Sequence, residues 1–102
     1  PDVSGVICNS DMVALGGCYA LQERGIIPGR EISIIGFDDV ADASFATPRL
    51  TTIQSQPSQL GQILAKTVME RIENPETPIY TMLTDATLVK RLTTGPVVKK
   101  SY

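Results

Sequence analysis

Two adjacent carboxylates, Asp38 and Asp39, follow directly after an apolar segment and have the clearest capacity for ligand binding in this sequence. Residues 32–37 are apolar and β-branched almost throughout, which is typical of a strand buried on both faces. In an open α/β sheet, ligand-binding groups collect just beyond the carboxyl ends of the strands. A carboxylate in that place accepts hydrogen bonds from vicinal hydroxyls, each worth roughly 1.5–3 kcal/mol. Asp is also a common turn residue, so a solvated turn is the alternative interpretation.

A second polar pair precedes this strand by one helix. Residues 3–8 alternate weakly and predict a short strand, and residues 11–24 predict a helix that is apolar or small nearly all round. Ser10 is a suitable N-cap, and Asp11 suits the positive end of a helix. Gly25 is a natural residue to end it.

Strand, helix and strand together form a βαβ unit, in which the two strands are parallel. Ser10 and Asp11 then follow the same end of the sheet as Asp38. Carboxylates from two segments converge on one edge, as a binding crevice requires.

The rest of the chain supplies a third polar cluster and a second helix. Residues 40–48 are irregular, with room for one helical turn, and residues 50–53 predict a strand that ends in Gln54 and Ser55. Pro57 suits the first position of a helix that runs to Asn74. Two short strands are predicted at residues 79–83 and 86–92, and we expect a mobile tail after residue 95.

Composition excludes several classes of protein. The chain has 102 residues, a net charge of -2 and no His, which removes the commonest metal ligand and general base. We therefore predict no catalytic residue, no metal and no cofactor. No apolar run is long enough to span a membrane, and the basic residues form no large patch for nucleic acid.

Cys8 and Cys18 are predicted to be buried free thiols of a reducing, cytoplasmic compartment.

The start of the chain is unusual. It begins at Pro1 without an initiator Met and reaches a strand within a few residues. We expect it to be a piece of a longer protein.

Five motifs, in order along nearly the whole chain, resemble one family. Residues 8–16 (CNSDMVALG) resemble its "NDxxALG" segment, and residues 34–39 (IIGFDD) resemble its "VVGFDD" strand. Residues 47–53 (TPRLTTI) match "TPxLTTI", and Leu60-Gly61 falls at the expected distance beyond it. Residues 88–94 (LVKRLTT) resemble the closing "LVxRxST". The chain thus resembles the C-terminal part of a LacI/GalR-type transcription regulator.

The resemblance implies an α/β fold: an incomplete, Rossmann-like parallel-sheet lobe of the two-lobed, type I periplasmic-binding-protein-like fold. Residues 1–55 would form the C-terminal lobe, residues 56–84 the last elements of the N-terminal lobe, residues 85–95 a return strand, and residues 96–102 a tail. It also implies a small effector, a sugar or nucleoside-like metabolite, held between the lobes. DNA would be bound only through an absent N-terminal helix-turn-helix domain.

Carried over residue by residue, the resemblance implies an effector site. Asp38 matches the carboxylate that accepts from ligand hydroxyls. Ser10 and Asp11 match an Asn-Asp pair, so that Ser replaces Asn. Ser55 matches a position that is often Gln, and Gln54 lies beside it. Asp39 has an alternative role, which is to cap or orient the loop.

The resemblance also implies a homodimer. The first helix is too apolar for one sheet face to cover, and the segment 40–45 exposes apolar side chains. We predict a symmetric interface near Leu15, Tyr19, Val40 and Phe45.

The function predicted is ligand sensing by a DNA-binding regulator, in which closure of the lobes changes operator binding. The alternative is a sugar- or solute-binding protein of a transport system with the same fold. The Asp38-Asp39 pair and the ending at residues 88–94 favour the regulator. An enzyme is the least favoured class, because nucleophile–base pairs, phosphate loops and spaced metal ligands are lacking.

Overall fold

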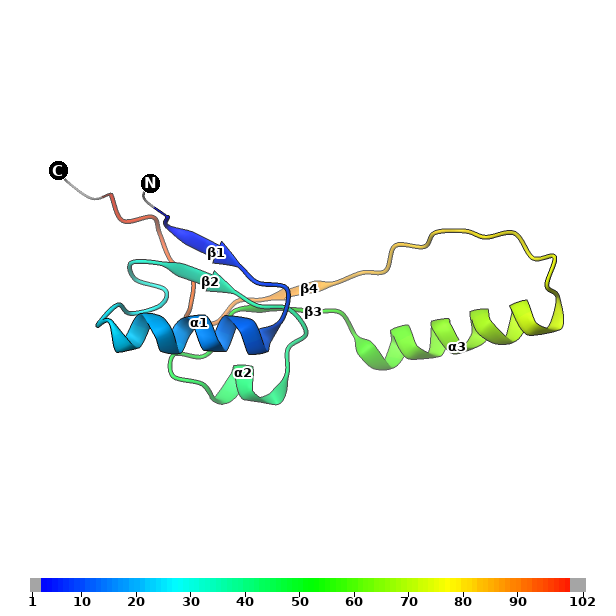
Figure 1. The fold of residues 1–102 in the computed structure, drawn as a ribbon, viewed down its shortest axis with the longest axis horizontal. Coiled ribbons are helices and arrows are strands. Elements are labelled where there is room, and N and C mark those ends of the chain that lie inside the picture. The colour runs from blue at the N-terminus through cyan, green and yellow to red at the C-terminus, as the bar shows by residue number, and fades with distance from the viewer. Residues whose placement is uncertain (1–2, 100–102) are drawn as a thin grey trace. The chain divides into compact units, whose positions relative to one another are not determined.

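The computed structural model describes residues 3–99, which divide into two compact units. Within this described range, the first unit comprises the residues up to Gln54 and those from Thr87 onward, and the second comprises Ser55–Ala86. Figure 1 shows the helices and strands of each unit. That the second unit belongs to a second lobe stays a prediction.

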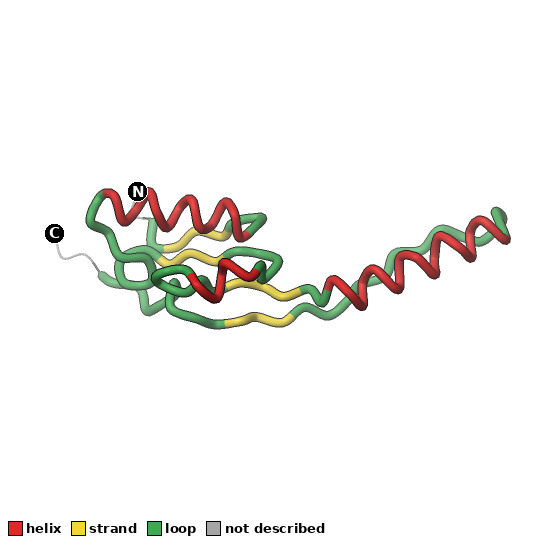
Figure 2. The backbone as a smooth tube through the Cα atoms, turned by 90° about the horizontal axis from the view of Figure 1, so that it is seen from below, coloured by secondary structure: helices red, strands yellow, loops and turns green. Residues whose placement is uncertain are grey.

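Four short strands form the first unit: β1 (Gly5–Ile7), β2 (Ser33–Ile35), β3 (Thr52–Gln54) and β4 (Thr87–Val89). β1 and β2 pair in parallel, and β3 and β4 pair antiparallel. A parallel bridge between Ile35 and Thr51 joins the two pairs. Figure 2 shows the four strands running side by side. The predicted parallel βαβ arrangement is confirmed.

Helix α1 (Asp11–Glu23) begins and ends as its sequence predicts. The Ser10 hydroxyl accepts a hydrogen bond from the backbone N–H of Val13 at 3.3 Å, which satisfies one free N–H of the first turn. The helix ends at Arg24, and Gly25 follows with φ +73, a left-handed conformation that glycine adopts at little cost.

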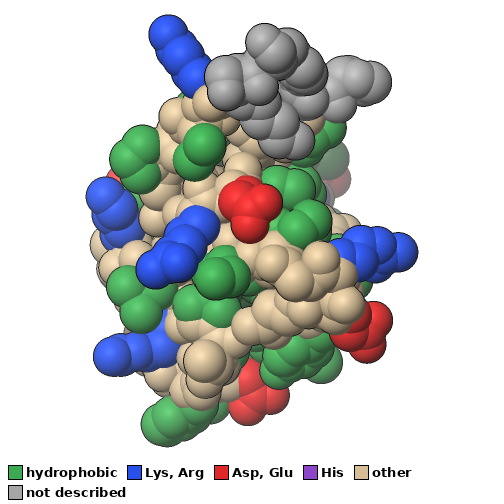
Figure 3. All heavy atoms as spheres, turned by 90° about the vertical axis from the view of Figure 1, so that its left-hand side faces the viewer, with side chains coloured by type: hydrophobic (Ala, Val, Ile, Leu, Met, Phe, Trp, Pro, Cys, Tyr) green, Lys and Arg blue, Asp and Glu red, His purple; other side chains and the backbone are tan. Residues whose placement is uncertain are grey.

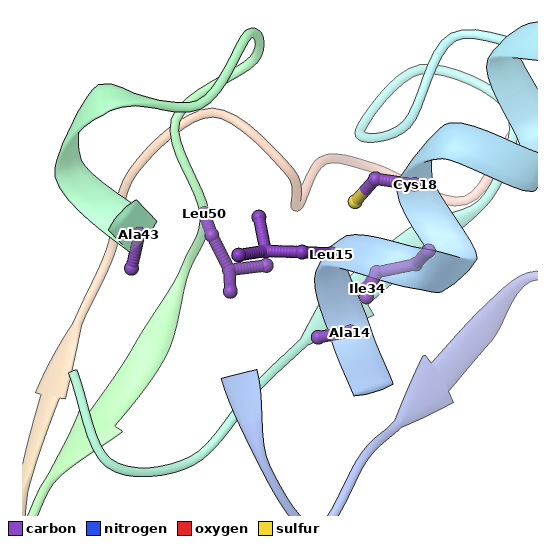
Figure 4. Close-up of a cluster of buried hydrophobic side chains, with 6 residues drawn as sticks. All are labelled: Ala14, Leu15, Cys18, Ile34, Ala43 and Leu50. Atoms are coloured by element: carbon purple, nitrogen blue, oxygen red, sulfur yellow. The ribbon is translucent and has the colours of Figure 1, made fainter. Parts of the chain in front are cut away.

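The core of the first unit is small. Ala14, Leu15 and Cys18 on α1 pack with Ile34 on β2, with Leu50, and with Ala43 on the short helix α2 (Ala41–Phe45). Figure 4 shows Leu15 and Leu50 meeting between the two helices. The single helical turn predicted in residues 40–48 is α2.

Two strand predictions need correction. The strand expected at residues 32–37 spans only Ser33–Ile35, and of those six residues only Ile34 and Gly36 are buried. The strand expected at residues 3–8 is β1, all three residues of which are exposed. Within residues 3–99, β1 pairs with β2 alone, so its other edge and both its faces meet solvent. The apolar composition of residues 3–8 and 32–37 therefore predicts more burial than these residues have in the structure.

The second unit is built around helix α3 (Pro57–Glu73), with Pro at its first turn as predicted. None of its residues is buried. Its large apolar side chains recur at helical spacing and form one row, which we call the α3 row: Leu60, Ile63, Leu64, Val68 and Ile72. The Arg71 guanidinium donates to the carbonyl of Thr77 at 2.9 Å and holds the following turn against the helix end.

The strand predicted at residues 79–83 is not formed, because this segment pairs with no strand in the part of the chain that is described. Of the predicted mobile tail at residues 96–102, the last three residues lie outside the described range. Residues 96–99 are in neither helix nor strand.

Candidate functional site

Three segments are held together at the carboxyl ends of the strands in the first unit. The backbone N–H of Asp11 donates to the carbonyl of Phe37 at 2.9 Å, which ties the start of α1 to the end of β2. The N–H of Asp38 donates to the carbonyl of Ile53 at 2.9 Å, which ties the end of β2 to β3. The structure therefore brings the regions of Ser10, Asp38 and Gln54 to one edge, as the sequence predicts.

Asp38 is the exposed carboxylate of this edge. It has φ +117, and Asp39 next to it has φ +58, so two consecutive non-glycine residues occupy positive φ. Such backbone geometry is uncommon and persists where the surroundings enforce it. The backbone therefore forms the turn that the alternative interpretation expected at Asp38 and Asp39, and this turn presents the Asp38 side chain to solvent.

The Asp39 side chain is mostly buried and forms hydrogen bonds with other residues of the chain. One carboxylate oxygen accepts from the Arg91 guanidinium at 2.8 Å, and the other accepts from the side-chain amide of Gln54 at 3.1 Å. These contacts match the alternative role given to Asp39, which is to orient the loop. Gln54 remains exposed, although its amide N–H₂ is already bonded to Asp39.

Asp11 requires a correction. The sequence predicts a ligand contact, but Asp11 is fully buried. One carboxylate oxygen accepts from the Thr52 hydroxyl, and the other accepts from the backbone N–H of Val40 at 2.8 Å. A buried carboxylate bonded in this way has no surface on which to meet a ligand, and instead fixes α1 against β3 and the start of α2.

Gly36 makes this packing possible. A Cβ atom at residue 36 would overlap a carboxylate oxygen of Asp11 and would also press on Leu50. The glycine of the "GFDD" motif is therefore required by the close approach of the Asp11 side chain, since its own φ is not among the positive ones.

The two predicted serine contacts, Ser10 and Ser55, lie in different units of the chain. The Ser10 hydroxyl caps α1 and is half-buried at the edge. Ser55 belongs to the second unit, where it lines a cavity of about 410 Å³ together with residues from α3 and from the segment 82–85. Ligand binding by Ser55 stays a prediction.

Sequence reasoning missed Arg91, Thr52 and Thr93. Thr93 is fully buried; its hydroxyl donates to the carbonyl of Ile34 at 2.7 Å and accepts from the N–H of Thr51 at 2.9 Å. A signal was present only in general form, because a buried hydroxyl group needs a hydrogen-bond partner. The partner of each residue depends on the tertiary fold, and no short-range pattern indicates it.

The two cysteine thiols, Cys8 and Cys18, are free. Cys18 is buried and Cys8 is half-buried. Burial raises the pKa of both thiols, and the neighbouring Cys8 raises that of Cys18 further. The structure agrees with the prediction of free thiols, but Cys8, which was predicted to be buried, is only half-buried.

The four residues predicted at a dimer interface differ in their exposure to solvent. Leu15 is only 5% exposed and packs in the core, so its placement at a subunit interface is wrong: the core of the chain already covers it. Tyr19 and Phe45 are 55% and 82% exposed, and Val40 is half-buried against the core. An interface near Tyr19, Val40 and Phe45 stays a prediction.

Other kinds of site find no support in residues 3–99. These residues contain no group of three His, Cys, Asp or Glu side chains that could hold a metal ion. No helix among them is long and apolar enough to cross a membrane. The face drawn in Figure 3 mixes basic, acidic and hydrophobic side chains and shows no continuous patch of one charge.

Comparison with known proteins gives consistent matches. Residues 1–94 match the periplasmic binding protein-like domain family. The chain is 34% identical over 88 residues to the ribose operon repressor of Haemophilus influenzae, covering 86% of this chain and 26% of that protein. It is 39% identical over 80 residues to the transcriptional repressor PurR of Glaesserella parasuis, covering 74% of this chain and 24% of that protein. The chain thus spans about a quarter of these relatives.

Solved structures agree. A LacI family regulator from Enterococcus faecalis with bound ribose matches with a TM-score of 0.83 and 32% identity, covering 96% of this chain and 37% of that one. The lac repressor dimer bound to operator and an anti-inducer matches with a TM-score of 0.81 and 32% identity, covering 91% of this chain and 32% of that one. The chain therefore belongs to the periplasmic-binding-protein-like domain family and corresponds to the C-terminal region of LacI/GalR-type transcription regulators.

Proposed function

We propose that this chain is part of the effector-sensing region of a bacterial DNA-binding transcription regulator. The observation that carries the proposal is the exposed Asp38 carboxylate, held in a left-handed turn at the carboxyl edge of the sheet. The curated relatives are transcriptional repressors, which favours a regulator over a transport protein or an enzyme.

The ligand class follows from the chemistry of this edge. An ionised carboxylate only accepts hydrogen bonds, and its two oxygens suit adjacent hydroxyl groups of a sugar. The Ser10 hydroxyl and the Gln54 side-chain oxygen add neutral polar groups nearby. Two similar regulators, from Enterococcus faecium and Enterococcus faecalis, are described with bound ribose. A pentose, alone or in a nucleoside-like metabolite, is therefore the first candidate effector.

The proposed mechanism is allosteric. The effector binds between this lobe and a second lobe supplied by the rest of the regulator, and closure of the lobes changes the spacing of the DNA-binding heads. Because such coupling is reciprocal, operator DNA changes effector affinity by the same factor. DNA contact itself belongs to a separate N-terminal domain of this cytoplasmic regulator.

We propose a homodimer as the working form. Tyr19 and Phe45 offer exposed aromatic surface in the first unit. A related lac repressor is described as a dimer on its operator. Phe45→Arg in the intact regulator is expected to favour the monomer in sedimentation, and an unchanged dimer would place the interface elsewhere.

A ligand screen on the intact regulator tests the main proposal. We expect at least one sugar or nucleoside in a panel led by D-ribose to raise the melting temperature, and to change operator affinity in a gel-shift titration. A rise in melting temperature without any change in operator binding would favour a transport protein. Enzymatic turnover of a sugar would overturn the proposal.

A further inference from the structure

Arg91 contacts three parts of the loop region that ends β2 and begins β3. Its guanidinium donates to the Asp39 carboxylate at 2.8 Å and to the carbonyl of Leu50 at 3.0 Å. Its backbone N–H donates to the Thr51 hydroxyl at 2.9 Å. One residue from the closing segment of the chain thus holds the turn that carries Asp38.

The turn needs such a restraint. Asp38 and Asp39 both have positive φ, a region that residues with a Cβ adopt at a cost. Asp38 is tied through its N–H to Ile53, and Val40 is tied through its N–H to Asp11. The side chain of Asp39, between these two points, is fixed by Arg91 and Gln54.

Charge gives Arg91 a second effect. Two adjacent carboxylates repel each other when nothing neutralises them. Arg91 pairs with Asp39 and leaves Asp38 as the open acceptor. The two side chains of the ion pair are 18% and 13% exposed, so water and salt screen the pair only in part.

We propose that Arg91 is a positioning residue for effector binding: it clamps Asp39 so that the Asp38 carboxylate faces the ligand in a fixed orientation. This inference rests on the proposed function, in which Asp38 meets the ligand. The guanidinium contacts that carry this role are made within the chain, to Asp39 and to the carbonyl of Leu50, so the role is positioning rather than ligand contact. Lys cannot replace it fully, since a single ammonium lacks the planar fork that reaches both acceptors.

The first experiment tests whether Arg91 restrains the Asp38 loop; it uses the 102-residue chain and needs no ligand. Amide hydrogen exchange is measured by NMR at Asp38, whose N–H is bonded to Ile53, and at Ile34, whose N–H is bonded to Thr93. Arg91→Gln is expected to accelerate exchange at Asp38 by about tenfold and to leave Ile34 unchanged, because the loop loosens locally. Arg91→Lys should give an intermediate rate.

The exposed neighbour provides the matched control. Lys90→Gln removes the same charge from the adjacent position and should change neither rate. An unchanged hydrogen-exchange rate at Asp38 in Arg91→Gln would show that Arg91 does not restrain the loop, and would overturn the proposal. A parallel acceleration at Asp38 and Ile34 would also overturn it, because Arg91 would then support the whole unit rather than the loop.

The second experiment tests the link to ligand binding in the intact regulator, with D-ribose as the probe in isothermal titration. Arg91→Gln is expected to weaken binding by about tenfold with an unchanged melting temperature, and Arg91→Lys to recover part of the loss. Wild-type affinity in a variant whose loop has loosened would overturn the positioning role.

The two proposals can fail separately. If Asp38→Asn leaves D-ribose affinity unchanged, the assigned ligand contact is wrong and the positioning role falls with it. If the wild-type protein binds no D-ribose, ribose is wrong as the effector, and the same comparison is made with the ligand that the screen identifies. The exchange experiment still decides whether Arg91 holds the loop.

Discussion

The two long helices of this chain, α1 and α3, have opposite surroundings. α1 has four buried residues and is covered by β2 and by Leu50. α3 is longer and has a clear apolar row, yet none of its residues is buried. An apolar pattern predicts that a helix forms and which face will be covered, but not whether the covering segment belongs to the same chain.

The largest expected contrast comes from one chemical change made in both regions. Leu50→Ala removes a fully buried side chain and should lower the free energy of unfolding by about 2–5 kcal/mol. Leu64→Ala on α3, where the side chain is 56% exposed, should change it by less than about 0.5 kcal/mol. Urea unfolding of the 102-residue chain, followed by circular dichroism, measures both. Equal losses would mean that a second copy or another segment covers the α3 row.

Glycine substitutions give a smaller contrast with opposite signs. Gly36→Ala places a methyl group against the Asp11 carboxylate and should destabilise the first unit by about 1–3 kcal/mol. Gly61→Ala lies in α3 with open space around it and should stabilise that helix by up to about 1 kcal/mol. Thermal unfolding monitored at 222 nm is the measurement. A neutral Gly36→Ala would contradict the close packing of Asp11.

Thiol reactivity gives the smallest effect. Because burial raises the pKa of Cys8 and Cys18, little thiolate forms at pH 7, and alkylation by iodoacetamide should be slow. Cys18 should react more slowly than Cys8, since it is the more buried. Met69→Cys, at an exposed position on α3, should react as a free thiol does. Mass spectrometry of the labelled chain checks the order, and rapid labelling of Cys18 would show that the core opens.

The same thiols predict a weak pH dependence of stability. A raised pKa means that the folded state favours the neutral thiol. The stability from these residues is therefore fully present below the ordinary thiol pKa of about 8.5 and is lost as the pH rises above it. Cys18→Ala should remove most of the decrease in the free energy of unfolding between pH 7 and pH 10, measured by urea unfolding.

Much of the fold could be predicted because local signals were strong. Ser10 and Gly25 bounded α1, Pro57 began α3, and the polar residues after residues 33–35 and 52–54 indicated the edge of the sheet. The strands were predicted too long, since apolar composition does not show how many residues of a segment pair with a neighbouring strand.

The site was predicted less well than the fold. Asp11 was assigned to a ligand, but the structure buries it against Thr52 and Val40. Leu15 was assigned to a dimer surface, but it packs in the core. Arg91 lies 52 residues from its partner Asp39 in sequence, and no local pattern joins them. Roles that depend on long-range partners are the ones that the sequence could not determine.

Effector binding by Asp38 is the central claim, and one substitution in the intact regulator tests it most directly. Isothermal titration with the best ligand from the screen compares Asp38→Asn with Asp42→Asn, a matched change on α2. Asp38→Asn should cost about 2 kcal/mol or more, which is about 30-fold in Kd, at an unchanged melting temperature. Asp42→Asn should bind as the wild type does. Unchanged affinity in Asp38→Asn would contradict the account and leave Asp38 as a turn residue.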